Sequence, residues 1–599
     1  MSRRDARSLA TYCLLLVSGA AWGDEQPLIV TATRTEEIAD AALAPVIVID
    51  REQIEQSQAS DVAELLRSYA GLDISRNGGP GQATSLFLRG TNSNQTLVMV
   101  DGVKINPGTI GGPDLQNIDP NLIQRIEIVE GPRSALYGSD AIGGVINIIT
   151  RRGAAQGLSG DAYAGAGRYA TYKAGAGLHD TGNDYRAGVD VGYTDTSGFP
   201  ARTGSAVNSG YTNTSVSLSG GKRLGPVDSE LSLWQASGTS DYLDFTLNPV
   251  SQDYTNRIVS LRLNTALLDT WTTTLQLSQA TDLIDQNQSG DYDHTRRNVL
   301  DWQHNLQVGQ AQLLTGGLYV AAEHVSSIVF GSGYGEDLDT RAVYAQDDIS
   351  LGAHRLLLAA RYTDHDAFGR HTTWDAEYGY RFSARTRVSA AVATAFRAPD
   401  ATDLYGFGGN PQLKPEVSRN LELALHHQLD ARQSLAVDAF DNRIRDLIEY
   451  DLISNQEMNI DSARIRGIQL SYDLHVRPWE ARVEAIAQNP VDEATGTALL
   501  RRARRSLTAA AAYNPGRYRI GLEWLLSGRR RDASISDGST VYDGGYGLLN
   551  LTASRQLSSR WSVLGRLENL TNQHYTLADG YNTAERSLYV EIRYGSTPR

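Results

Sequence analysis

Few side chains of this 599-residue chain stand at spacings that would support covalent chemistry. The sequence has neither the G-x-S-x-G turn of a serine hydrolase nor the H-E-x-x-H helix of a zinc hydrolase. Its 11 histidines are scattered. The only adjacent pair, His426 and His427, lies in a segment that alternates as a strand does. The sequence therefore does not predict an enzyme.

A bound metal ion is the second kind of chemistry to consider, and its candidate ligands are Asp241 and Asp244. Calcium usually takes about six to eight oxygen ligands, so two carboxylates supply only part of a calcium site. No other residues call for a cofactor, and none is expected to be required.

The charge of the chain argues against nucleic acid as a partner. Long runs of basic residues are absent apart from the small cluster at 501–505 (Arg-Arg-Ala-Arg-Arg), and the net charge is −14. Phosphate binding needs a basic face, which this balance does not favour. The chain also holds 29 Tyr but only 9 Phe. Tyrosine, with an apolar ring and a polar edge, suits a membrane–water interface.

The N-terminus has the pattern of a secretory signal peptide. Arg3, Arg4 and Arg7 precede the apolar run Leu9 to Ala21, and Ala21-Trp22-Gly23 forms a small-x-small end. This run is shorter than the roughly 20 apolar residues that a spanning helix needs. We expect residues 1–23 to be removed. The only cysteine, Cys13, lies in this segment, so the mature chain depends on no disulfide.

Residues 35–153 have the mixed pattern of a compact α/β domain. Ile54 to Tyr69 has helical spacing, with Ser60-Asp61 as an N-cap. Asp101-Gly102 is a two-residue turn that predicts a hairpin between Thr96 to Val100 and Val103 to Ile105. The other expected strands are Pro45 to Asp50, Thr84 to Leu88, Leu122 to Val129 and Gly144 to Ile149.

Residues 154–599 alternate apolar and polar side chains in short segments separated by turn residues. One example is Leu588, Val590 and Ile592 against Tyr589 and Glu591. Period-two alternation predicts strands with one apolar and one polar face. A closed barrel that crosses a membrane explains both this alternation and the lack of spanning helices. The alternative is a secreted, soluble β-repeat protein, which would not need detergent.

The expected fold is therefore mostly β, with an antiparallel transmembrane barrel and an N-terminal plug in its lumen. At roughly 20 residues for each strand and its connection, the region holds about 22 strands, and a barrel that wide must be plugged. Residues 35–153 are the expected plug domain.

Several motifs resemble those of TonB-dependent receptors, a family of outer-membrane importers. In the plug they are residues 87–91 (Phe-Leu-Arg-Gly-Thr), 98–103 and 130–150, the last beginning Glu-Gly-Pro-Arg-Ser. In the barrel they are 396–399 (Phe-Arg-Ala-Pro), 410–416 and 568–572 (Glu-Asn-Leu-Thr-Asn). The resemblance covers most of the mature chain. It implies a monomer in outer-membrane lipid. It also implies that import is driven by TonB and its inner-membrane energising complex. An outer-membrane hydrolase is the alternative from another functional class.

The resemblance also implies how the plug is held and pulled. A plug in a polar lumen is expected to be fixed by hydrogen bonds and ion pairs rather than by an apolar interface. Buried charges must be paired, and the candidates for plug–wall pairing are Arg89, Glu127, Glu130 and Arg133. Within segment 24–34, the run Leu28, Ile29, Val30, Thr31, Ala32, Thr33 resembles the TonB box. Such an extended β-former can add to a sheet edge on TonB.

Within the family, the chain looks most like the vitamin B12 transporter branch. This implies that two plug loops, residues 77–82 and 106–112, reach the ligand, and glycine there allows close backbone approach. The residues concerned are Asn77, Gly79, Gln82, Asn106, Gly108 and Gly111. Val207 to Tyr211, where the branch carries calcium-binding aspartates, has no carboxylate, which leaves a calcium requirement open.

The imported ligand stays open between cobalamin or a related corrinoid and a ferric siderophore. Haem is disfavoured, because haem receptors carry an axial histidine between their Phe-Arg-Ala-Pro and Asn-Pro-x-Leu boxes. Asp400 to Gly409 contains none. The last strand is expected to end at Tyr594, five residues before the end of the sequence.

Overall fold

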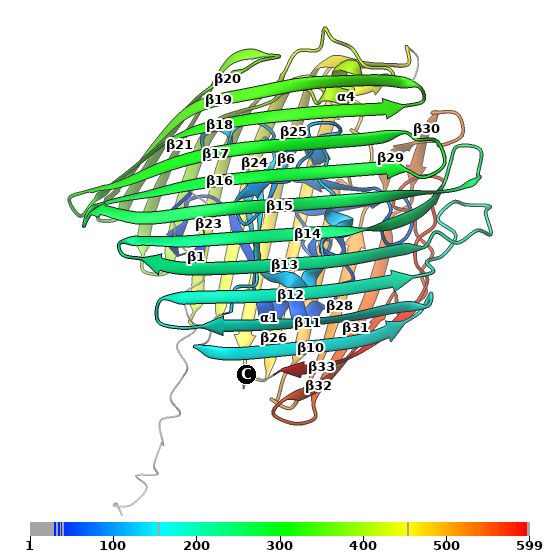
Figure 1. Cartoon of the computed structure of the whole chain (residues 1–599), viewed down its shortest axis with the longest axis horizontal. Coiled ribbons are helices and arrows are strands. Elements are labelled where there is room, and N and C mark those ends of the chain that lie inside the picture. The colour runs from blue at the N-terminus through cyan, green and yellow to red at the C-terminus, as the bar shows by residue number, and fades with distance from the viewer. Residues whose placement is uncertain are drawn as a thin grey trace, which may run out of the picture.

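The computed structural model describes residues 29–30, 34–35, 37–38, 41–153, 156–451 and 454–595. The expected signal peptide, residues 1–23, lies outside these ranges. Strands from the second part of the chain close into a barrel of 22 strands, in which each strand pairs antiparallel with its neighbour in sequence. The first strand, β10, pairs with the last, β33, and closes the ring. The expected number and arrangement of strands is confirmed, and Figure 1 shows the strands stacked around the plug.

The barrel strands vary in length around the wall. They are β10 (Gly157–Gly167), β11 (Thr171–Thr181), β12 (Tyr185–Thr196), β13 (Tyr211–Leu224), β14 (Val227–Leu243), β15 (Pro249–Leu268), β16 (Trp271–Gln286), β17 (Tyr292–Val308), β18 (Gln312–Val329), β19 (Ser332–Leu351), β20 (His354–His365), β21 (Gly369–Ser383), β22 (Thr386–Arg397), β23 (Glu416–Asp430), β24 (Gln433–Asp451), β25 (Gln456–Val476), β26 (Trp479–Asp492), β27 (Arg505–Tyr513), β28 (Tyr518–Ser527), β31 (Tyr546–Gln556), β32 (Trp561–Glu568) and β33 (Ser587–Gly595).

The predicted alternation places apolar side chains on the outside of the barrel. In β33, Leu588, Val590 and Ile592 are exposed, whereas Glu591 is buried against the lumen. Several strands begin with an exposed aromatic residue at the same end of the barrel: Tyr185, Trp271, Trp479, Tyr518 and Trp561. Rings of aromatic residues mark the membrane interface in outer-membrane barrels, so this end lies at one surface of the bilayer.

The two ends of the barrel differ in their connections. Turns such as 225–226, 269–270 and 352–353 join strands at the end with the aromatic ring. The longest connections, 398–415, 528–545 and 569–586, all leave the other end. Short turns face the periplasm and long loops face outward in this class of barrel. The loop 528–545 carries the hairpin of β29 (Arg530–Ala533) and β30 (Thr540–Asp543), and 398–415 carries helix α4 (Ala401–Tyr405).

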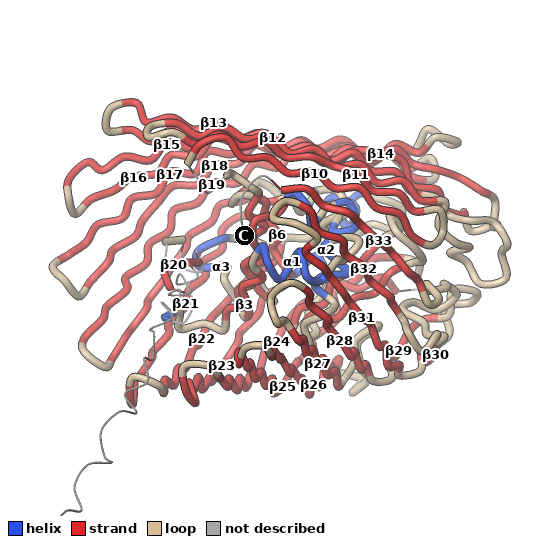
Figure 2. The backbone as a smooth tube through the Cα atoms, turned by 90° about the horizontal axis from the view of Figure 1, so that it is seen from below, coloured by secondary structure: helices blue, strands red, loops and turns tan. Residues whose placement is uncertain are grey.

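The plug is a small α/β domain inside the barrel (Figure 2). Its main sheet has the order β3 (Val46–Ile49), β8 (Ile123–Glu130), β9 (Gly144–Thr150), β6 (Thr96–Val100) and β7 (Val103–Lys104). A second sheet pairs β4 (Leu72–Arg76) with β5 (Thr84–Leu88). The helices are α1 (Arg51–Ser57), α2 (Val62–Leu66) and α3 (Ser134–Tyr137), with 3-10 turns η2 (Ser93–Gln95), η3 (Leu115–Asn117) and η4 (Pro120–Leu122).

Local sequence signals account for most of these plug elements. Val100 pairs with Val103 across Asp101-Gly102, and both turn residues have positive φ, which confirms the predicted hairpin. The segment 54–69, predicted to have helical spacing, is divided between the end of α1 and α2, because Gln58 is left-handed (φ 52°) and ends α1. Asp61 then caps α2 by accepting from the Glu64 amide, so the N-cap is confirmed. None of the helices in the described ranges is both long and apolar enough to cross a membrane.

Candidate functional site

Arg89 ties the plug to the barrel wall through a cluster of carboxylates. Its guanidinium lies 2.8 Å from Glu130 of the plug, 3.1 Å from Glu422 of β23 and 3.8 Å from Asp438 of β24. It also lies 4.9 Å above the ring centre of Phe440. Burial raises the pKa of Glu130, and the Arg89 charge opposes that rise. One cation therefore lies against three carboxyl groups at the interface of plug and wall.

Arg133 makes a second tie of the same kind. It lies 2.8 Å from Asp375 of β21 and forms an ion pair with Glu377 of the same strand. Glu127 is placed differently from the other predicted charges, because it pairs with Arg125, 2.8 Å away in the same plug strand. Of the four predicted pairing residues, Arg89 and Arg133 contact wall carboxylates directly, and Glu130 acts through Arg89.

The interface between plug and wall is not held by polar contacts alone, which corrects the expectation from the sequence. The main plug core includes Trp234 and Ala236 of β14, Ile258 of β15 and Ala280 of β16. A second cluster joins Ala70 and Ile142 of the plug to β22 and β24–β26. A third joins Leu43, Ala135 and Leu136 to β20. Alternation alone did not reveal these contacts, because it does not tell which lumen positions face the plug.

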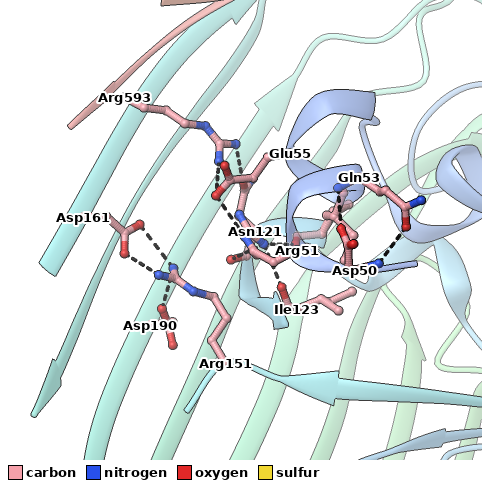
Figure 3. Close-up of polar contacts among 12 residues, drawn as sticks. Asp50, Arg51, Gln53, Glu55, Asn121, Ile123, Arg151, Asp161, Asp190 and Arg593 are labelled. Atoms are coloured by element: carbon pink, nitrogen blue, oxygen red, sulfur yellow. Dashed lines mark hydrogen bonds and ion pairs between the residues drawn. The ribbon is translucent and has the colours of Figure 1, made fainter. Parts of the chain in front are cut away.

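A group of charged residues connects the first plug helix to the strands that close the barrel (Figure 3). Glu55 of α1 lies 3.0 Å from Arg51 and 3.5 Å from Arg593 of β33. Beside it, Arg151 pairs with Asp161 of β10 and lies 2.9 Å from Asp190 of β12. Burial lowers the pKa of Arg51, whose guanidinium also donates to the carbonyls of Pro120 and Ile123.

The first predicted ligand loop, residues 77–82, contacts the wall closely. The Gln82 amide donates to the Asp241 carbonyl at 2.8 Å and to the Ser240 hydroxyl at 3.3 Å. A Cβ at Gly79 would lie 3.1 Å from the Phe199 ring, so glycine permits that approach. Asn77 is half-buried, whereas Gly79 and Gln82 are buried.

The second predicted ligand loop, residues 106–112, is held by its own asparagine and by the outer loop 398–415. Asn106 is fully buried, accepts from the Val98 amide at 2.8 Å and donates to the Gly111 carbonyl at 3.0 Å. The Ala401 amide of α4 donates to the Gly108 carbonyl at 2.9 Å. Ile110, at the tip, is exposed. Asn106 therefore shapes the loop, and the tip faces outward.

The family-like motifs at 396–399 and 410–416 meet in an ion-pair network that sequence reasoning did not assign. Arg397 lies 3.0 Å from Glu416 and 3.1 Å from Asp403, and it is almost fully buried. The amide of Gln95 in the plug donates to Glu416 at 2.7 Å. These contacts fix the loop that covers the plug. Gln95 and Glu416 are 321 residues apart, which is too far for spacing to reveal their contact.

The predicted TonB box lies at the edge of the described structure. Leu28, Thr31, Ala32 and Thr33 lie outside the described residues, whereas Ile29–Val30 (β1) pairs with Glu37–Ile38 (β2). Two ion pairs fix this segment to the wall: Arg34 to Asp301 at 2.7 Å and Glu37 to Arg355 at 2.9 Å. The sequence did not single out these two charges.

Asp241, the first candidate metal ligand, lies near the end of β14, and Asp244, the second, lies in the loop that follows. The Asp244 carboxylate accepts from the amides of Thr246 and Asn248, both at 2.8 Å, and these bonds lower its pKa. No group of three or more metal-ligating side chains occurs in the part of the chain that the structure describes. Asp244 thus caps its own loop.

Comparison with known proteins gives matches along both parts of the chain. The family description "TonB-dependent Receptor Plug Domain" matches residues 39–145, and "TonB dependent receptor-like, beta-barrel" matches residues 151–570. A protein of Photobacterium profundum named "Vitamin B12 transporter BtuB" is 32% identical over 613 aligned residues, covering 98% of this chain and 99% of that protein.

Solved structures with the same fold share much less sequence. A variant of the ferric enterobactin receptor PfeA from Pseudomonas aeruginosa superimposes with a TM-score of 0.79 at 18% identity, covering 92% of this chain and 98% of that one. The FrpB iron transporter from Neisseria meningitidis superimposes with a TM-score of 0.80 at 16% identity. The superposition covers 92% of this chain and 99% of that one. At these identities the likeness concerns the fold alone.

Proposed function

The chain belongs to the family of TonB-dependent outer-membrane receptors, and from this premise we propose that it imports cobalamin or a related corrinoid. Proteins of this family are transporters and receptors rather than enzymes, and this chain lies in the outer membrane as a plugged barrel. The outer membrane holds no ATP, so import against a gradient takes its work from TonB.

One observation carries the choice of ligand. The relative that is 32% identical over 98% of this chain bears the name of a vitamin B12 transporter. The second plug loop adds support, because its tip is exposed beside the outer loop 398–415, where an incoming ligand would meet it. Ile110 at the exposed tip of the second loop adds an apolar contact.

A ferric siderophore is the second candidate, favoured by a different observation. The structures with the same fold include a ferric enterobactin receptor and an iron transporter. Their sequence identity to this chain is 18% and 16%, below that of the vitamin B12 transporter. Ligand preference follows side chains more closely than it follows the barrel, so cobalamin remains the first choice.

The purified receptor is expected to bind cyanocobalamin with nanomolar affinity, about −12 kcal/mol. A transporter for a scarce nutrient needs binding of this strength to capture it. The measurement is equilibrium binding in detergent, with a panel of ferric siderophores as the comparison. Micromolar binding of cyanocobalamin beside nanomolar binding of one siderophore would reverse the choice of ligand.

Calcium is expected to have little effect on this binding. Asp244 already accepts hydrogen bonds from its own loop, and residues 207–211 offer no carboxylate. Cyanocobalamin affinity measured with a strong chelator should therefore stay within about twofold of the affinity measured in calcium, less than about 0.5 kcal/mol. A loss of tenfold or more in chelator, restored by added calcium, would show that other carboxylates form a calcium site.

A further inference from the structure

Three arginines on the outer face of the barrel stand directly opposite one another on neighbouring strands. Arg419 of β23 pairs with Arg443 of β24, and Arg443 pairs with Arg464 of β25. Figure 2 shows these three strands side by side in the wall. Side chains along a strand point alternately to its two faces. Because the adjacent Asn420 and Asn442 are buried in the lumen, the three arginines point outward, and we call them the arginine row.

The arginine row lies at the outer limit of the apolar surface that faces lipid. Strand β23 begins at the outward loop 398–415, so Arg419 lies near the outer end of this strand. Toward the periplasm from Arg419, the same face of β23 carries Leu421, Leu423 and Leu425, all of which are exposed. Lipid chains cover the apolar band of an outer-membrane barrel. The arginine row therefore lies at the level of the lipid headgroups of the outer leaflet.

Carboxylates of the protein balance only part of the arginine row. Arg443 lies 2.7 Å from Glu493, and Arg464 lies 2.6 Å from Asp441. Arg419 forms no ion pair with any side chain that the structure describes. Like charges directly opposite each other on neighbouring strands are destabilising. The row is therefore costly to the barrel unless a further anion lies against it.

Two more arginines extend this positive surface. Arg445 follows Arg443 by two residues on β24, and Arg466 follows Arg464 by two residues on β25, so both lie on the same outer face. Arg466 lies 3.3 Å from Asp441, which it shares with Arg464. Arg445 is exposed and has no ion pair within the described part of the chain. The five arginines, which we call the arginine patch, thus outnumber the carboxylates that pair with them.

Arginines on another part of the outer face are arranged differently. Arg341 of β19 stands opposite Asp364 of β20, and Asp364 stands opposite Arg370 of β21. Arg341 also lies 3.9 Å from Asp339, and Arg370 lies 3.6 Å from Asp364. Arginine and aspartate alternate across these strands, so each cation has an acidic neighbour. The excess of cations in the arginine patch is therefore not a general property of the outer face.

We propose that the arginine patch binds the phosphate groups of a lipid in the outer leaflet of the membrane. A guanidinium group matches a phosphate group with two parallel hydrogen bonds. Neighbouring strands lie about 4.8 Å apart, so the row from Arg419 to Arg464 covers roughly 10 Å. A headgroup with two phosphate groups can therefore contact more than one arginine at once.

The apolar surface beside the patch identifies a lipid, rather than a free phosphate ion, as the source of the phosphate groups. A free ion would meet the same arginines but would make no use of the exposed Leu421, Leu423 and Leu425. A lipid whose headgroup lies on the patch places its acyl chains along these leucines. This inference does not depend on which ligand the receptor imports.

The test measures lipid binding to the purified receptor in detergent by native mass spectrometry. The probe is diphosphoryl lipid A, a glycolipid with two phosphate groups. The same glycolipid without phosphate groups and inorganic phosphate are the comparisons. The unmodified receptor is expected to bind the diphosphoryl lipid at least tenfold more tightly than either. Equal binding of the glycolipid without phosphate groups would overturn the proposal, and so would equal binding of inorganic phosphate, since a free ion would then be the ligand.

A double variant, Arg419→Gln with Arg445→Gln, removes two cations of the patch and breaks no ion pair between described side chains. It is expected to bind the diphosphoryl lipid at least tenfold more weakly, because each arginine near a membrane surface adds to the affinity for anionic lipid. The matched control is Arg341→Gln with Arg370→Gln, whose side chains are 72% and 73% exposed. The control should change the affinity less than twofold. Unchanged binding by the patch variant, or an equal loss in the control, would overturn the proposal.

A variant with the opposite expected effect excludes a folding defect as the cause of the loss. Glu493→Gln removes a carboxylate that competes with the lipid phosphate groups for Arg443. It should strengthen binding of the diphosphoryl lipid at least twofold, and unchanged or weaker binding would contradict the proposal. All variants must keep the gel mobility of the folded barrel.

Discussion

Replacing Leu28 by proline is expected to reduce energised uptake to the level of cells that lack TonB, with ligand binding unchanged. Proline removes a backbone donor and fixes φ, so it disrupts the addition of a strand to a sheet edge. Leu28 directly precedes β1, which is two residues long and pairs only with β2 among the described strands. The described part of the box, β1, pairs with β2, whereas the loops 77–82 and 106–112 contact Asp241 and the outer loop 398–415.

Leu28→Ala is the matched control, because it shortens the same side chain but keeps the backbone donor. It should keep most of the uptake. The measurements are uptake of labelled ligand at equal surface abundance, and equilibrium binding to isolated outer membranes. Normal uptake by the proline variant would show that TonB does not pair with this segment. If binding fell along with uptake, the variant would be acting on folding.

Replacing Arg89 by alanine is expected to destabilise the seated plug by about 3–5 kcal/mol, the usual cost of leaving buried charges without their partner. Glu130, Glu422 and Asp438 would then lose their shared cation, and each would have to stay charged without a partner or take up a proton. The plug should come loose at lower urea concentration. Cells should also become sensitive to a large antibiotic that the seated plug excludes.

Arg341→Ala is the control for this prediction. Its side chain is 72% exposed and lies 3.9 Å from Asp339, so its removal should cost less than about 1 kcal/mol. Adding Glu130→Gln to the Arg89 variant should restore part of the lost stability by removing one of the three charges. If Arg89→Ala behaved like the control, the cluster would not hold the plug in place.

The sequence predicts the architecture well because the determining signals are local. Alternation in residues such as Leu588 to Ile592 depends only on which face meets lipid, and it recurs in every strand. The hairpin at Asp101-Gly102 and the cap at Asp61 also follow from neighbouring residues. The left-handed Gln58 that ends α1 carries no glycine or proline signal, so that end is not predicted.

The contacts that position the plug are long-range, and the sequence predicts them poorly. Trp234 and Ile258 face the plug, although residues of the same type elsewhere in the wall face lipid. Arg89 is recognisable as a charge that needs a partner, but its partner Glu422 is 333 residues away. Arg34 and Glu37 were not singled out, because each lies in a polar segment where a charge is ordinary.

The closure of the barrel also determines the order in which the protein can be assembled. Residues 161–167 pair with 589–595, the partners of greatest sequence separation in the ring, through only seven residue pairs. Contacts between distant segments form slowly because the intervening chain must first be brought together. Synthesis delivers β33 last, long after the plug has left the ribosome. The ring therefore closes through its least local pairing, and the strands between β10 and β33 can pair with their sequence neighbours before it forms.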